Sequence, residues 1–137
     1  MAQPVPQAEP TRFHNTPRVL VVDDDAKLAG ILVRALERAG YECIDAQSGD
    51  QALWAVMSGR PHAIVLDVMI PHPSGVEVCR YLRGQGWGGG IVMISARSNP
   101  DDRAAATRAG ADVFLAKPFG LTELVAAVQS LVGSPID

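Results

Sequence analysis

From Arg18 onward, short apolar runs alternate with longer stretches of helical periodicity. The runs are continuous and rich in β-branched residues, which is typical of strands that are covered on both faces. The predicted strands are residues 19–22, 41–46, 63–66, 91–94 and 113–116. The predicted helices are residues 28–39, 52–57, 76–82, 101–109 and 121–132. The fourth helix is the weakest, because its alanines supply helix propensity but little apolar bulk.

This alternation predicts an open parallel α/β sheet with helices on both faces, built from right-handed crossovers. We expect Asp25 to cap the first helix, and Asp101 and Asp102 to cap the fourth. Trp87 lies in a glycine-rich segment that predicts a flexible loop. In sheets of this kind, ligands bind beyond the carboxyl ends of the strands. The residues that follow each strand are therefore the candidate site.

The length of 137 residues fits one domain. Residues 1–17 contain four prolines and few apolar groups, so we expect a flexible N-terminal extension there. Residues 18–132 form the predicted folded domain, and residues 133–137 are a tail or the start of a linker.

The net charge and the positions of the cysteines exclude several classes of function. The net charge of -3 gives no basic field for direct nucleic-acid binding by this domain. Cys43 and Cys79 lie far apart in apolar stretches, which is neither a disulfide framework nor a metal-ligand spacing. No stretch has the apolar length of a membrane span, and no secretory signal begins the chain. We therefore expect a soluble, cytoplasmic protein that does not bind membranes.

Reactive side chains follow four of the five strands. Asp23, Asp24 and Asp25 follow the first strand, Asp67 ends the third and Ser95 ends the fourth. Clustered carboxylates without His or Cys favour a hard cation such as Mg²⁺, with Mn²⁺ as an alternative.

Lys117 follows the fifth strand and is one of only two lysines among 12 basic residues. A lysine and a hydroxyl beside carboxylates suit a tetrahedral oxyanion. The set predicts a phosphoryl-transfer site. Asp67 is its central candidate, because a carboxylate oxygen can itself be the nucleophile and form an aspartyl phosphate.

Four strings now carry a specific resemblance. They are Val-Leu-Val-Val-Asp-Asp-Asp (19–25), Ile-Val-Leu-Asp-Val-Met-Ile-Pro (64–71) with Gly75, Met-Ile-Ser-Ala (93–96) and Ala-Gly-Ala-Asp-Val-Phe-Leu-Ala-Lys-Pro-Phe (109–119). In this order they resemble the CheY-like receiver domain of two-component response regulators, over Arg18 to about Val132. The resemblance implies a flavodoxin-like, doubly wound sheet of five parallel strands in the order 2-1-3-4-5, with five helices.

The resemblance also implies residue roles. Asp67 matches the phosphoacceptor, and Asp23 and Asp24 match the acidic pair that binds Mg²⁺, one of them through water. Asp67 itself and the backbone carbonyl of Met69 complete the metal ligands.

Further matches concern the switch. Ser95 matches the hydroxyl that turns toward the phosphoryl group, and Lys117 matches the lysine that pairs with that group. Phe114 matches the aromatic residue that moves inward in the active state. Lys117-Pro118 resembles the family's cis peptide bond.

The implied function is a binding switch rather than a turnover enzyme. A histidine kinase would phosphorylate Asp67 in a Mg²⁺-dependent reaction that the domain itself catalyses, followed by slow self-dephosphorylation. The surface of the fourth helix, fifth strand and fifth helix would then change. The pattern is closest to the OmpR/PhoB winged-helix subfamily, which implies transcriptional regulation through an absent or separate DNA-binding domain.

That subfamily dimerises through charge pairs on the same surface. Here Val113 stands where an Asp is common, and residues 121–132 carry Glu123 but no Lys or Arg. A pair between Arg103 and Glu123 remains. We therefore expect a weakened or altered homodimer.

Two alternatives stay open on the residues alone. A small phosphohydrolase of the haloacid-dehalogenase type would use Asp23 as nucleophile and Asp25 as acid, but Lys27 replaces the expected Thr or Val and Asp67 would have no role. A flavin- or nucleotide-binding module would need a glycine-rich first turn, which the acidic run replaces.

Overall fold

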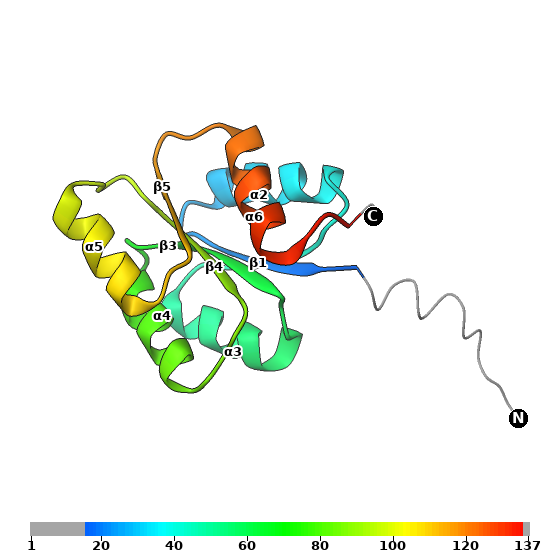
Figure 1. The fold of residues 1–137 in the computed structure, drawn as a ribbon. Helices are drawn as coiled ribbons and strands as arrows, with labels where there is room; N and C mark the ends of the chain where they lie inside the picture. Colours follow the sequence, from blue (N-terminus) through cyan, green and yellow to red (C-terminus); the bar gives the residue numbers. More distant parts are fainter. Residues whose placement is uncertain (1–15, 136–137) are drawn as a thin grey trace, which may run out of the picture.

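The computed structural model describes residues 16–135 and shows strands and helices in strict alternation (Figure 1). The strands are β1 (Arg18–Val22), β2 (Glu42–Ala46), β3 (Ala63–Asp67), β4 (Gly90–Ser95) and β5 (Val113–Ala116). The helices are α2 (Ala26–Arg38), α3 (Gly49–Gly59), α4 (Gly75–Gly84), α5 (Pro100–Ala109) and α6 (Leu121–Val132). Each predicted element is present, although the structure starts several of them one to three residues from the predicted bound. The expected N-terminal extension lies outside the described residues, except for Thr16 and Pro17.

The five strands form one parallel sheet in the order β2-β1-β3-β4-β5, which confirms the flavodoxin-like fold. Helices α2 and α6 cover one face, and α3, α4 and α5 cover the other (Figure 1). Within residues 16–135, no helix is long and apolar enough to cross a membrane.

The sheet separates two apolar clusters. Leu20 and Leu66 pack toward α3, α4 and α5, whereas Val19, Val21 and Val65 pack toward α2 and α6. Successive strand side chains point to opposite faces, so a strand buried on both sides must be apolar at every position. This is why the central strands read as continuous apolar runs.

Polar caps fix where the helices begin. The side chain of Asp25 accepts a hydrogen bond from the amide of Leu28 and caps α2, as predicted. The prediction for α5 was wrong, because Asn99 is its cap and accepts from the amide of Asp102 at 2.9 Å. Pro100 occupies the first helical position, where its fixed φ suits a helix start, so Asp101 and Asp102 lie inside the first turn.

The glycine-rich loop between α4 and β4 has anchors that its composition did not reveal. Arg83 donates hydrogen bonds to the carbonyl oxygens of Trp87, Gly89 and Gly110 and to the carboxylate of Asp112, at 2.7 to 3.0 Å. Its guanidinium also lies 5.7 Å from the centre of the Trp87 ring, which packs against the core. A single side chain therefore fixes this loop to the start of β5, at the end of the sheet opposite the candidate site.

Candidate functional site

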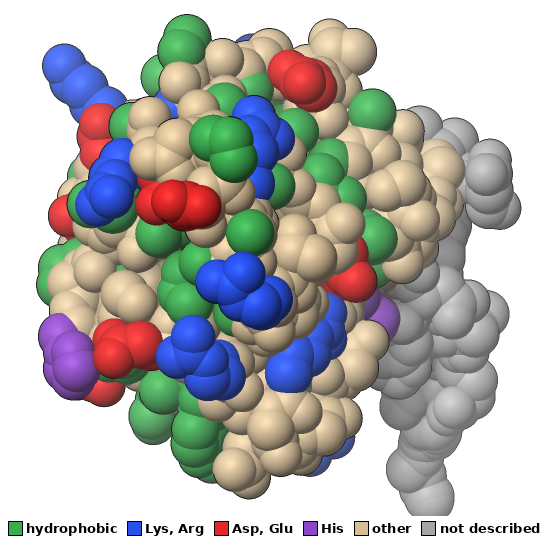
Figure 2. Space-filling view, turned by 60° about the vertical axis from the view of Figure 1, so that its left-hand side comes forward, with side chains coloured by type: hydrophobic (Ala, Val, Ile, Leu, Met, Phe, Trp, Pro, Cys, Tyr) green, Lys and Arg blue, Asp and Glu red, His purple; other side chains and the backbone are tan. Residues whose placement is uncertain are grey.

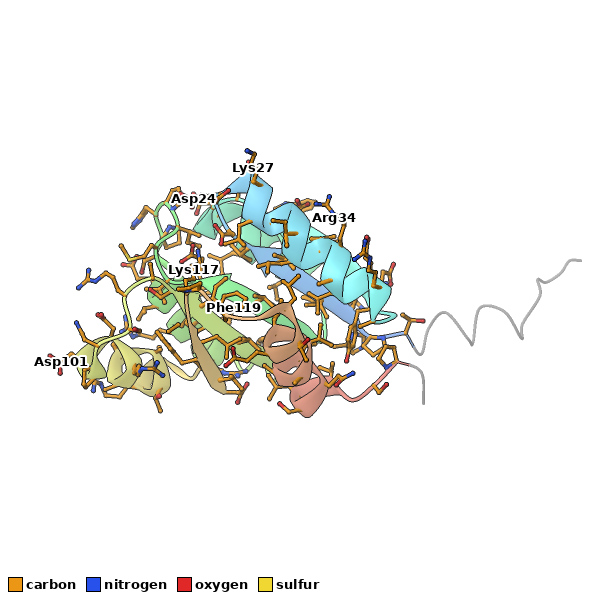
Figure 3. The ribbon with its side chains drawn as sticks, turned by 90° about the horizontal axis from the view of Figure 1, so that it is seen from above. Asp24, Lys27, Arg34, Asp101, Lys117 and Phe119 are labelled. Carbon is orange, nitrogen blue, oxygen red and sulfur yellow. The ribbon has the colours of Figure 1, made fainter. Side chains whose placement is uncertain are left out.

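Charged side chains meet at the carboxyl ends of β1, β3 and β5. Asp23 directly follows β1, Asp67 is the last residue of β3, and Lys117 directly follows β5. The Lys117 ammonium lies 3.1 Å from an oxygen of Asp23 and 3.0 Å from an oxygen of Asp67. Figure 3 shows Asp24 and Lys117 on this side of the molecule. The carboxyl ends of parallel strands share one edge, so residues distant in sequence converge there.

Burial distinguishes the members of this cluster. Asp23, Asp67 and Ser95 are the only buried polar or charged side chains in the described part of the chain, with exposed fractions of 0%, 3% and 0%. Asp24 is exposed. Buried polar groups are costly unless they are paired, so their concentration at one edge marks a functional arrangement.

Hydrogen bonds orient both buried carboxylates. One oxygen of Asp23 accepts from the amide of Asp25, and one oxygen of Asp67 accepts from the amide of Met69, each at 2.9 Å. The second oxygen of each carboxylate accepts from Lys117. The loops after β1 and β3 thus hold the two acids in the same way.

The Lys117 ammonium, which Asp23 and Asp67 share, does not fully offset the effect of burial on the pKa of Asp67. Burial raises the pKa of Asp67, and the charge of Asp23 raises it further, against the opposing hydrogen bonds from Met69 and Lys117. Burial alone would lower the pKa of Lys117, but its hydrogen bonds to Asp67 and Asp23 outweigh that effect and raise it. Lys117 therefore stays protonated, while the ionised form of Asp67 is disfavoured.

The carboxylates fit a divalent cation. Asp23, Asp24 and Asp67 each offer an oxygen, and the three oxygens lie within 4.8 Å of one another. Three carboxylates against one ammonium leave excess negative charge, and an all-oxygen donor set favours a hard ion. The ligand role expected for the carbonyl of Met69 stays a prediction.

Ser95 lies beside this cluster at the end of β4. Its neighbour Ile94 pairs with Asp67, and the carbonyl of Ser95 accepts from the amide of Lys117 at 2.8 Å. Its hydroxyl accepts from the amide of Arg97 at 3.0 Å. In this conformation the hydroxyl belongs to its own loop rather than to the carboxylates.

Phe114 and the Lys117–Pro118 bond complete the residues singled out from sequence. Phe114 lies on β5, half-buried against the cluster beneath α3, α4 and α5. The guanidinium of Arg103 lies 4.9 Å from its ring centre, a contact that the sequence did not indicate. The Lys117–Pro118 peptide bond is cis.

Gly75 has a structural role that sequence reasoning missed. Its amide donates to the carbonyl of Val68 at 3.0 Å. A Cβ atom at this position would collide with the carbonyl oxygen of Asp67 and lie 2.7 Å from Cα of Val68. The start of α4 therefore packs directly on the main chain that carries Asp67. In the sequence, Gly75 was noted only as part of the motif that follows Asp67, and nothing else indicated this contact.

The response regulator receiver domain family matches residues 19–129 of this chain. The chain belongs to that family. Response regulator MprA of Mycolicibacterium vanbaalenii is 46% identical over 115 residues, which are 84% of this chain and 50% of MprA. Transcriptional regulatory protein PrrA of Mycobacterium tuberculosis is 46% identical over 117 residues, which are 85% of this chain and 50% of PrrA. This chain spans about half the length of the curated relatives it matches.

Solved receiver structures agree with the fold. The receiver domain of Francisella response regulator 1452 superposes with a TM-score of 0.82 at 31% identity and covers 85% of this chain and 97% of its own. Response regulator DrrB, a Thermotoga maritima OmpR/PhoB homolog, superposes with a TM-score of 0.77 at 27% identity and covers 83% of this chain and 51% of its own. The phosphohydrolase alternative finds no support in these matches.

In a chelating buffer near neutral pH, we expect Asp67→Asn to raise the free energy of unfolding by on the order of 1 kcal/mol. The raised pKa means that the folded receiver binds a proton at Asp67 more readily than the unfolded chain does. Ionised Asp67 therefore costs stability above its folded pKa, and this cost vanishes as the pH falls through that pKa. The gain from the substitution should shrink accordingly in acidic buffer, as measured by urea unfolding.

The exposed Asp50 in the first turn of α3 provides the matched control, and Asp50→Asn should give no gain. Added Mg²⁺ should stabilise the unchanged receiver and narrow its difference from Asp67→Asn. An Asp67→Asn protein that is less stable than the unchanged receiver throughout this pH range would show that the Lys117 bond outweighs burial.

Proposed function

We propose that this receiver domain accepts a phosphoryl group on Asp67 from the phosphohistidine of a sensor histidine kinase. The observation that carries the proposal is the buried Asp67 carboxylate, held at the open edge of the sheet by Lys117 and the Met69 amide. A nucleophile in this position is oriented before its substrate arrives, which is how proteins accelerate phosphoryl transfer.

The reaction forms a bond between an Asp67 oxygen and phosphorus while the bond between phosphorus and the donor nitrogen breaks. Lys117 holds negative charge on the transferring phosphoryl oxygens, and the Met69 amide keeps the carboxylate in line. When bound by Asp23, Asp24, Asp67 and the Met69 carbonyl, Mg²⁺ supplies the remaining positive charge. Ser95 then leaves the Arg97 amide and donates its hydroxyl to the phosphoryl group.

The output of this reaction is a change of surface. Movement of Ser95 and Phe114 alters the surface made of α5, β5 and α6, which would regulate a DNA-binding domain and so transcription. The match to a transcriptional regulatory protein, PrrA, supports this output. The domain is phosphorylated once per cycle, so it works as a switch rather than as a turnover enzyme. With a net charge of -3, it leaves DNA binding to another domain.

Incubation with acetyl phosphate and Mg²⁺ should add one phosphoryl group, as measured by intact mass. Asp67→Asn and a chelator should each abolish the adduct, because they remove the nucleophile and the divalent charge respectively. Asp50→Asn, which alters an exposed carboxylate that is not part of the Asp23, Asp24 and Asp67 cluster, should be phosphorylated normally.

Peptide mapping of the adduct separates the competing mechanisms. Label on Asp67 supports the receiver mechanism, whereas label on Asp23 with continuing phosphate release would indicate a phosphohydrolase. A receiver that binds Mg²⁺ but takes no label from either acetyl phosphate or any histidine kinase would refute phosphorylation at Asp67.

Loss of the phosphoryl group should be slow, and Met69→Asn should accelerate it several-fold. Met69 is 52% exposed two residues after Asp67, and its thioether cannot orient an attacking water as an amide can. The rate is the decay of the intact-mass adduct after removal of acetyl phosphate. Met57→Asn, at a 77% exposed methionine on α3, is the control. Equal decay in all three proteins would contradict this role for Met69.

The phosphorylated receiver should form only a weak or altered dimer. On the surface of α5, β5 and α6, the Arg103 guanidinium lies over the ring of Phe114 in the same chain. Glu123 is the only charged residue of α6. Isolated exposed charge pairs contribute little to association. Sedimentation of the phosphorylated protein should therefore give a mass that depends on concentration in the micromolar range. A dimer that persists well below that range would contradict the expectation.

A further inference from the structure

Arg103 joins two segments that belong to different parts of the fold. It extends from α5, and its guanidinium carbon lies 4.9 Å from the centre of the Phe114 ring on β5. Its Nε donates a hydrogen bond to the carbonyl oxygen of Ser98, at 3.0 Å, in the loop between β4 and α5. One side chain therefore connects that loop to the fifth strand.

Both connected segments lead directly to the candidate site. Ser98 comes three residues after Ser95, whose hydroxyl accepts from the amide of Arg97. Phe114 comes three residues before Lys117, whose amide donates to the carbonyl of Ser95. The contacts thus form a closed circuit through the end of β4, its following loop, α5 and β5.

Arg103 is distinguished by these contacts from its neighbours. Several Lys or Arg side chains lie on the face of the molecule that contains α5 (Figure 2). Arg108, on the same helix, is exposed and makes no hydrogen bond, ion pair or ring contact with the described residues. Arg97 pairs with Asp102 at 3.6 Å, but that pair does not reach the aromatic ring.

We propose that Arg103 is a latch that holds Phe114 and the β4–α5 loop in the present conformation and thereby opposes activation. The proposal rests on the proposed function, because it concerns how phosphorylation of Asp67 is read. When the Ser95 hydroxyl turns toward a phosphoryl group, it gives up the Arg97 amide, and the following segment, including the Ser98 carbonyl, shifts. Arg103 then loses its acceptor, and its hold on the Phe114 ring weakens.

The side-chain chemistry of arginine fits this role. The planar guanidinium stacks over an aromatic face through the attraction of a cation to the ring. The same group has fixed N–H directions, so one arginine can cover a ring and donate to a carbonyl at once. A lysine ammonium would keep the charge over the ring without that fixed geometry.

The test measures binding of beryllofluoride, a phosphoryl mimic, in the presence of Mg²⁺. A latch that favours the inactive conformation lowers the population able to bind, so Arg103→Ala should lower the dissociation constant about three- to tenfold. Arg103→Lys should fall between Arg103→Ala and the unchanged protein, and Arg108→Ala should leave the constant unchanged. Urea unfolding first verifies that each variant is folded.

The direction of the effect separates the latch from simple electrostatics. Removal of a nearby positive charge by itself weakens the binding of an anion, whereas loss of the latch tightens it. In a Phe114→Leu background the tightening should be lost, because the ring that Arg103 holds is gone. The ¹⁹F resonance of 4-fluorophenylalanine at position 114 should also move, in unliganded Arg103→Ala, toward its position in the beryllofluoride complex.

Each outcome is decisive. If the unchanged receiver binds no beryllofluoride, the proposed function fails, and the latch fails with it. If the unchanged receiver binds but Arg103→Ala binds equally or more weakly, the latch is overturned while the proposed function stands. Equal tightening in the presence and absence of the Phe114 ring overturns the latch as well.

Discussion

The shared ammonium of Lys117 is the interaction on which the candidate site depends. Two buried carboxylates, Asp23 and Asp67, face each other across the ends of adjacent strands, and among residues 16–135 only this cation lies within 3.1 Å of both. Burial raises the pKa of Asp67 and the charge of Asp23 raises it further, so the pair needs a counter-charge. Lys117 provides part of it, and the excess negative charge that remains makes this edge suitable for a divalent cation. The same excess of negative charge thus lowers the free energy of unfolding and favours the binding of a divalent cation.

Parallel pairing of the strands determines which residues meet at this edge. Asp67 pairs with Ile94 and Ser95 pairs with Ala116, so the ends of β3, β4 and β5 are aligned in register. A shift of one residue in either pairing would send these side chains toward the opposite face. The apolar runs that build the sheet therefore also position the reactive groups, although they contribute no chemistry themselves.

Much of this arrangement could be predicted from sequence, since continuous β-branched runs, caps and reactive residues at strand ends are local signals. Asp25 as a cap and the convergence of Asp67 with Lys117 follow from such signals. The start of α5 could not be predicted as well, because Asn99, Asp101 and Asp102 all have capping side chains and only Pro100 decides among them. The contacts of Arg83 and Arg103 were missed because a long side chain can reach several distant partners, and spacing along the chain does not select one.

The division of the core into two clusters limits how far a local change can spread. Phe114 packs with the cluster beneath α3, α4 and α5, whereas its neighbour Leu115 belongs to the cluster beneath α2 and α6. The sheet separates the two clusters. Close-packed cores rearrange in discrete steps rather than by gradual deformation. Movement of the ring therefore requires repacking on one side only. The proposed change on the surface of α5, β5 and α6 would therefore reach α6 only through the backbone of β5, where Leu115 follows Phe114.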